Sequence, residues 1–141
     1  MDFGFSDEQQ QIKATARELL TERSPFPRVR AAAEARVDDA ELWAELRGLG
    51  WPGIAVAEEH GGQGLGAVEL AILLEELGHA VAATPFLGTA LAAFAIQHGG
   101  SDAQRARWLP GLASGELTGG FGRPGLAADA AGAAAIVLIE D

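Results

Sequence analysis

Apolar residues recur at helical spacing along most of this chain, and glycine or proline separates each run from the next. The first run follows Ser6, which can form a capping box with Gln9, so we expect a helix from there to about Thr21. Its buried face would consist of Ile12, Ala16, Leu19 and Leu20.

Two shorter helices are expected next. Prolines at positions 25 and 27 break the first helix, because neither can donate to the helical hydrogen-bond ladder. An alanine-rich helix follows over residues 29–36, and Asp38 or Asp39 then caps a third helix that ends at the glycines of positions 48 and 50. The buried stripe of the third helix would contain Leu42, Trp43, Leu46 and Leu49.

The middle of the chain predicts a turn-rich segment and then a central helix. Residues 54–56 are a short apolar run typical of a strand, and the glycine-dense loop of residues 61–66 follows. The next helix ends at Gly78, and its apolar residues cover too wide an arc for a surface helix. These residues are Val68, Leu70, Ala71, Leu73, Leu74 and Leu77.

Two more helices follow. Pro85 can occupy the first turn of a helix that continues to Gln97. A second capping box, formed by Ser101 and Gln104, opens a short helix that we expect to stop at Pro110.

The pattern changes at position 115. Residues 116–121 and 135–139 are strand candidates, and a glycine- and alanine-rich connection over residues 122–132 joins them. Two strands without partners are not independently stable. We therefore predict a mainly α-helical domain over residues 1–115, followed by one or two strands of an incomplete β-domain over residues 116–141.

Composition limits the classes of partner. The 141 residues carry a formal net charge of −10 with no basic run, which argues against nucleic acid and anionic membrane surfaces. The sequence has no cysteine, which excludes disulfides and thiolate chemistry. The first residues lack the features of a signal peptide, and the longest apolar tract is too short to cross a bilayer. We expect a cytoplasmic protein that binds neither nucleic acid nor membrane.

Polar residues offer little catalytic chemistry of their own. The glycine loop precedes a helix, where amides can hold phosphate, but it lacks the lysine and hydroxyl of a P-loop, so we interpret it as a turn. Glu75 and Glu76 point in different directions on one helix, and we interpret them as solvated or capping carboxylates. The three histidines have no spacing typical of a shared metal. We assign no catalytic and no metal-binding residue.

The helix after Pro85 mixes small residues, such as Gly88, with large apolar ones, such as Leu87 and Leu91. Small residues on a buried helix permit either close packing or an apolar pocket. Composition favours packing, because pockets are few per protein.

Several short motifs follow one another over residues 1 to about 125. They are Phe5-Ser6-x-Glu8-Gln9, Leu49-Gly50-Trp51, Glu58-Glu59-His60-Gly61-Gly62-Gln63-Gly64-Leu65-Gly66, Glu75-Glu76-Leu77-Gly78 and Trp108-Leu109-Pro110-Gly111. Together they resemble the N-terminal helical domain of the acyl-CoA dehydrogenase family, running into the start of its middle β-domain.

The resemblance implies a fold and a chemistry. Family members add a β-barrel-like domain and a C-terminal helical domain, and they assemble as oligomers. They bind FAD and oxidise acyl-CoA thioesters: a glutamate removes the α-proton, and the β-hydrogen leaves as hydride to the flavin. The resemblance places Leu87, Gly88 and Leu91 in the wall of the acyl pocket, and Phe121 and Gly122 in a degenerate cofactor-binding segment. It also implies a homo-oligomer, or a heteromer with another subunit of the family.

This chain departs from the family pattern where the chemistry is built. The family's catalytic glutamate and most of its FAD contacts would lie beyond residue 141. Where the family usually has Thr-Glu-Pro-Gly-x-Gly-Ser-Asp, residues 122–129 read Gly-Arg-Pro-Gly-Leu-Ala-Ala-Asp, which removes two hydroxyl groups.

The departures leave three hypotheses for function. In the first, the chain alone is inactive, and it contributes a pocket wall and subunit contacts to FAD-dependent α,β-dehydrogenation of an acyl-CoA. In the second, it is a non-catalytic helical module that binds acyl-CoA or a partner subunit without flavin. In the third, it is a remnant with no separate function.

Overall fold

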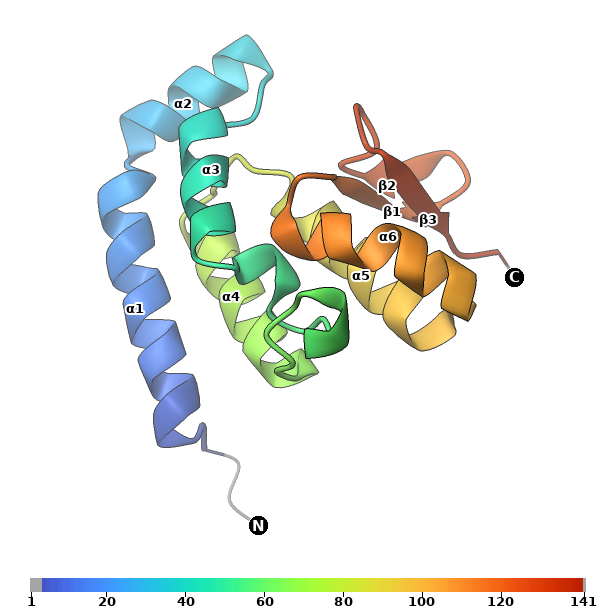
Figure 1. Cartoon of the computed structure of the whole chain (residues 1–141). Helices are drawn as coiled ribbons and strands as arrows, with labels where there is room; N and C mark the ends of the chain where they lie inside the picture. The colour runs from blue at the N-terminus through green and yellow to red at the C-terminus, as the bar shows by residue number, and fades with distance from the viewer. Residues whose placement is uncertain (1–3, 141) are drawn as a thin grey trace.

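The computed structural model describes residues 4–140, in which a series of helices precedes a small sheet (Figure 1). The helices are α1 (Asp7–Arg23), α2 (Phe26–Ala35), α3 (Ala40–Gly48), α4 (Ala67–His79), α5 (Phe86–Gly99) and α6 (Asp102–Ser114). Two 3-10 turns, η1 (Trp51–Gly53) and η2 (Glu58–His60), lie between α3 and α4. The strands are β1 (Gly119–Arg123), β2 (Leu126–Ala128) and β3 (Ala135–Leu138). This order confirms the predicted mainly α-helical fold.

Side-chain caps begin three of the helices. The Ser6 hydroxyl accepts a hydrogen bond from the Gln9 amide at 3.2 Å, and the Gln9 side chain accepts one from the Ser6 amide at 3.0 Å. Ser101 and Gln104 repeat this arrangement at α6, so both predicted capping boxes are confirmed. Of the two candidate aspartates, Asp39 caps α3.

α2 begins at Phe26, three residues before its expected start. Pro27 lies in the first helical turn, where a backbone N–H has no acceptor within the helix, so the missing donor costs little. At the other end Arg36 closes the helix in the left-handed region, with φ of 55°.

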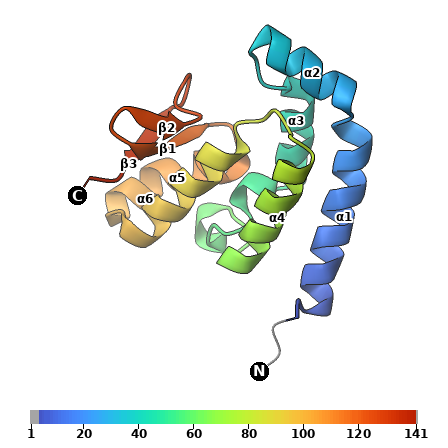
Figure 2. The same cartoon turned by 180° about the vertical axis from the view of Figure 1, so that it is seen from behind.

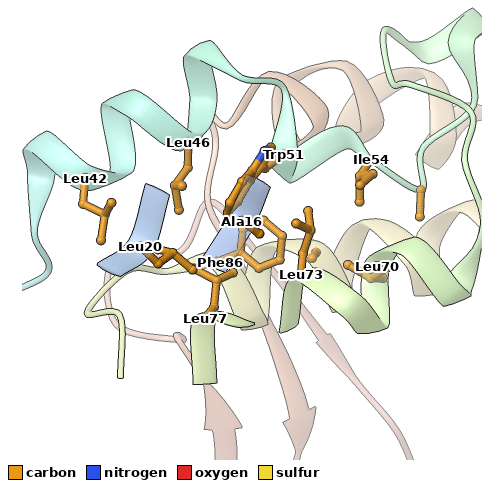
Figure 3. Packing of buried hydrophobic residues seen from close by; sticks show 12 residues of the cluster. Ala16, Leu20, Leu42, Leu46, Trp51, Ile54, Leu70, Leu73, Leu77 and Phe86 are labelled. Atoms are coloured by element: carbon orange, nitrogen blue, oxygen red, sulfur yellow. The ribbon is translucent and has the colours of Figure 1, made fainter. Parts of the chain in front are cut away.

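The main core lies between α1, α3 and α4, and the ring of Phe86 at the start of α5 completes it (Figure 3). α1 runs beside α4 in both views of the chain (Figures 1 and 2). The core residues labelled in Figure 3 are Ala16, Leu20, Leu42, Leu46, Trp51, Ile54, Leu70, Leu73, Leu77 and Phe86. The predicted apolar faces therefore meet, although Leu49 and Val68 are 47% and 48% exposed.

The sheet packs against α5, and α6 lies beside α5 (Figures 1 and 2). The strand order is β2-β1-β3, with β1 antiparallel to β2 and parallel to β3. The Gly119 amide donates to the buried hydroxyl of Thr89 at 3.1 Å. A Cβ at Gly119 would lie 2.7 Å from the Ala92 Cβ, so glycine lets β1 approach the helix closely.

The sheet has three strands, where the sequence predicted one or two. β2 lies inside the segment predicted as a connection. Pro124 and Gly125 form a two-residue turn between β1 and β2, and Gly125 has φ of 86°. β2 has only three residues, two of which are alanine, so it shows no alternating apolar pattern. Because α5 covers the sheet, these strands do not lack support.

The strand predicted over residues 54–56 is wrong. The Ile54 amide donates to the Trp51 carbonyl and the Val56 amide donates to the Gly53 carbonyl, which makes consecutive tight turns. The glycine-dense loop folds back over this segment, and amides of the loop bond to its carbonyls. The backbone carbonyls of this buried apolar run are therefore hydrogen-bonded by a loop and not by a neighbouring strand.

The predicted end of the last helix at Pro110 is also wrong, since α6 continues to Ser114. Proline removes one helical hydrogen bond. Leu109, Leu112 and Ala113 are nevertheless buried against the rest of the fold, so their packing favours continuation of the helix.

Candidate functional site

A groove of about 870 Å³ opens where α2, the end of α4 and the start of α5 meet the loop after β2. Its wall is mainly apolar and includes Val29, Ala32, Leu74, Leu77, Phe86 and Leu87. Its charged wall residues are Arg36, Asp38 and Asp129. A concave, mostly apolar surface with a few polar groups is the usual form of a small-molecule site.

The start of α5 is fixed to the loop after β2 by a close contact. The amide of Gly88 donates to the Asp129 carboxylate at 2.6 Å, so an aspartate distant in sequence binds an otherwise unpaired amide of the first helical turn. A Cβ at Gly88 would lie 2.6 Å from the Gly119 carbonyl oxygen and 2.8 Å from that of Ala128. Gly88 therefore serves close packing, the alternative that composition favoured.

The three predicted pocket residues occupy different surroundings. Leu87 is 45% exposed and lines the groove. Gly88 is buried beneath the loop. Leu91 is half-buried one turn further along α5, outside the set of described residues that line the groove. Of the three, only Leu87 is among the described residues that line the groove, and a role of Leu87, Gly88 and Leu91 in an acyl pocket stays a prediction.

Two aspartates that follow α2 have different electrostatic surroundings. Burial and the negative charge of Asp129 raise the pKa of Asp38, which lines the groove. Burial also acts to raise the pKa of Asp39, but hydrogen bonds from Arg28 and from the start of α3 lower it overall. Asp39 is thus a structural cap, whereas Asp38 presents its charge to the groove.

Glu76 is not the solvated carboxylate that the sequence suggested. Glu76 is 1% exposed, and its side chain forms ion pairs with Arg17 and with Lys13, whose Nζ lies 2.7 Å from Oε1. The hydrogen bond from Arg17 is the largest cause that lowers the pKa of Glu76 to about 2. Glu75 is mostly exposed and shares Lys13. This cluster joins α1 to α4 and lies away from the groove lining.

The glycine loop is a turn held by side chains. The Gln63 amide group donates to the carbonyl oxygens of Leu49 and Gly50 at 3.1 and 3.0 Å. At the start of α4, the Gly66 amide donates to the Glu69 carboxylate at 2.9 Å. A carboxylate of the chain itself thus bonds the amide that a phosphate would need, which supports the turn interpretation.

Over residues 4–140, no three histidine, aspartate or glutamate side chains are grouped as a metal site. No helix of the described chain is long and apolar enough to span a bilayer.

The family model described as "Acyl-CoA dehydrogenase, N-terminal domain" matches residues 6–116, which is most of the chain. The chain belongs to the acyl-CoA dehydrogenase family.

Three acyl-CoA dehydrogenase relatives show the extent of the similarity. Acyl-CoA dehydrogenase FadE12 of Mycobacterium tuberculosis is 42% identical over an alignment of 89 positions, which covers 58% of this chain and 22% of FadE12. A variant of the Tcur3481-Tcur3483 steroid ACAD has a TM-score of 0.71 at 39% identity, covering 79% of this chain and 31% of that one.

The structure of the ChsE4-ChsE5 complex from Mycobacterium tuberculosis has a TM-score of 0.74 at 29% identity, covering 84% of this chain and 33% of that one. The chain therefore spans between about a fifth and a third of the length of these acyl-CoA dehydrogenase relatives.

The segment that the resemblance assigns to the cofactor of an acyl-CoA dehydrogenase has another structural explanation. Phe121 pairs with Ala128 and Val137 inside the sheet. A Cβ at Gly122 would lie 2.2 Å from the Leu126 carbonyl oxygen, so the β1–β2 hairpin itself requires glycine there. Residues 122–128 contain no hydroxyl side chain. These residues therefore do not fit an FAD site built from side chains.

Sequence reasoning did not predict the approach of Asp38 to Asp129, or the Arg17–Glu76 ion pair. Both join segments that are far apart in the chain. A local signal existed only for the second pair, because Lys13 and Arg17 are four residues apart on one helix face.

Proposed function

We propose that this chain forms part of an acyl-CoA dehydrogenase assembly, in which it supplies a wall of the acyl pocket and subunit contacts. The observation that carries the proposal is the apolar groove beside the first turn of α5, with Leu87 on its rim. The assembly would carry out FAD-dependent α,β-dehydrogenation of an acyl-CoA thioester. We assign no catalytic residue to this chain.

The residues of the chain would act by shape and not by proton transfer. Leu87, Val29 and Leu77 offer apolar surface to an acyl tail. Gly88 keeps α5 close to the sheet, and Leu91 would contact a tail that extends along α5.

FAD accepts the hydride when it is bound, and it would be held mainly by parts of the assembly other than the described residues.

We propose a helical domain over residues 1–115 and the start of a β-domain over residues 116–141, in a cytoplasmic homo-oligomer or heteromer. The similarity to a protein solved as the ChsE4-ChsE5 complex supports the heteromer.

The second candidate is a non-catalytic module that binds acyl-CoA or a partner subunit without flavin. The altered segment of residues 122–128 favours it. Native mass spectrometry of the chain isolated gently from its host separates the two candidates. A flavin-containing complex with another acyl-CoA dehydrogenase subunit supports the first, and a flavin-free species supports the second.

The groove can be tested with a thioester that has no charge of its own, octanoyl-N-acetylcysteamine. Leu87→Trp would fill the rim of the groove. We therefore expect the dissociation constant of the thioester, measured by calorimetry, to be at least about fivefold higher for this variant than for the wild-type chain. Val68→Trp is the matched control, because Val68 is a similarly exposed residue in the first turn of α4 and outside the groove lining. Equal affinity of the wild-type chain and Leu87→Trp would refute the proposed wall.

A further inference from the structure

We infer that the groove selects uncharged acyl tails and disfavours tails that end in a carboxylate, because Asp129 and Asp38 place negative charge on its wall. This inference rests on the proposed role of the groove in acyl binding, and it names the chemical class of tail that the groove accepts.

Asp129 is held in place at the groove. Its carboxylate accepts the Gly88 amide hydrogen at 2.6 Å, and its backbone is left-handed with φ of 54°. Rotating the carboxylate away from the groove would leave the Gly88 amide without its partner, and an unpaired polar group of this kind is costly. The hydrogen bond therefore holds the carboxylate of Asp129 at the wall of the groove.

Asp38 approaches from the segment between α2 and α3. It makes no side-chain hydrogen bond or ion pair with another residue of the described chain, unlike Asp39 next to it. Asp38 and Asp129 both line the groove, and partial burial and then the charge of Asp129 raise the pKa of Asp38. An acyl tail that ends in the groove thus meets two carboxylates from segments far apart in the sequence.

Two positive groups oppose this effect. The N-terminal end of α5 carries a partial positive charge, which offsets part of the charge of Asp129. Arg36 also lines the groove, at the end of α2. Two carboxylates against one guanidinium still leave the wall negative, and the chain as a whole has a net charge of −10. Arg36 is the residue that would reverse the selectivity if it reached a tail carboxylate first.

The size of the effect follows from Coulomb's law. Like charges several ångströms apart in a partly desolvated groove repel enough to weaken binding by about five- to tenfold. A terminal hydroxyl adds polarity without charge, so it separates repulsion from the cost of removing a polar group from water.

The test uses three N-acetylcysteamine thioesters with equal carbon number, namely octanoyl, 8-hydroxyoctanoyl and 7-carboxyheptanoyl. Calorimetry with the 141-residue chain at neutral pH should give dissociation constants about five- to tenfold higher for the carboxylate than for the hydroxyl thioester. The ratio should fall toward one at high salt and in Asp38→Asn. Asp102→Asn, at a fully exposed aspartate outside the groove lining, should leave the ratio unchanged.

Three results would overturn the inference. Equal weakening by hydroxyl and carboxylate would mean that desolvation, and not charge, controls selectivity. If the carboxylate thioester bound more tightly than the hydroxyl thioester, and this preference disappeared in Arg36→Gln, the end of the tail would be bound by Arg36. Both outcomes leave the acyl-binding groove intact. Failure of all three thioesters to bind would refute the proposed groove itself, and the selectivity with it.

Discussion

The carboxylate of Asp129 accepts a hydrogen bond from the amide of Gly88 at 2.6 Å. This bond joins the loop after β2 to the first turn of α5, two segments separated by about forty residues in the sequence. It also sets one wall of the groove, because Asp129 and Leu87 both line it. The groove therefore depends on the contact between the helical part of the chain and the small sheet.

Loss of the Asp129 carboxylate should destabilise the fold. In Asp129→Ala the Gly88 amide loses its partner beneath the loop, so we expect the free energy of unfolding in urea to fall by about 1–2 kcal/mol. Asp102→Ala removes an exposed aspartate and should cost about 0.5 kcal/mol or less. Equal stability of Asp129→Ala and the wild-type chain would show that the bond contributes nothing.

Adding one methyl group to Gly88 should cost more. The new Cβ would lie well inside contact distance of the Gly119 and Ala128 carbonyl oxygens, so β1 and the loop would have to move away. We expect Gly88→Ala to lower the midpoint of thermal unfolding, with a loss of about 2–3 kcal/mol. Gly99→Ala on the same helix has open space around its Cβ and should be neutral or slightly stabilising. Similar behaviour of both variants would argue against close packing at Gly88.

The buried Glu76 should make the free energy of unfolding depend on pH. Its pKa is about 2 in the folded chain and about 4.5 when unperturbed, so its contribution is present above about pH 4.5 and is lost as the pH falls toward 2. At neutral pH we expect Glu76→Gln to cost about 3 kcal/mol, because Arg17 loses its buried partner.

Unfolding measured at several pH values tests this prediction. The stability difference between the wild-type chain and Glu76→Gln should shrink steadily below pH 4.5. Glu75→Gln alters a mostly exposed carboxylate and should differ little from the wild type at every pH. A difference for Glu76→Gln that stays constant down to pH 2 would contradict the assigned pKa.

The 141-residue chain alone should not reduce an electron-accepting dye when acyl-CoA and FAD are supplied. The segment of residues 122–128 has no hydroxyl side chain to contact a flavin, and no residue of the chain is assigned the removal of the α-proton. A full-length acyl-CoA dehydrogenase serves as the positive control. Saturable, acyl-CoA-dependent reduction by the pure chain would disprove the expectation.

Local signals predicted most of the fold. The capping boxes at Ser6 and Ser101 and the apolar spacing around Leu42 and Leu73 depend on neighbouring residues, so the sequence displays them directly. The predicted helix end at Pro110 is wrong because burial of the residues around it stabilises the helix by more than the lost hydrogen bond costs. No local sequence pattern predicts that burial.

The candidate site was less predictable, because distant segments build it. Leu87 lines the groove, whereas Gly88 and Leu91 lie outside its lining, and the acyl-pocket role of all three stays a prediction. Asp38 and Asp129 approach one another only through the packing of the sheet on α5, and Glu76 is buried only through the packing of α1 on α4. Composition and spacing contain no signal for such pairs.

Chemical-shift mapping of octanoyl-N-acetylcysteamine on the ¹⁵N-labelled chain tests the central claim most directly. If the groove is the acyl wall, the largest saturable shifts should occur at amides around it, including those of Ala32, Val81, Leu87 and Ala131. Shifts concentrated instead at the separate hollow beside β3, around Trp108 and Leu138, or no saturable shift at all, would contradict the account.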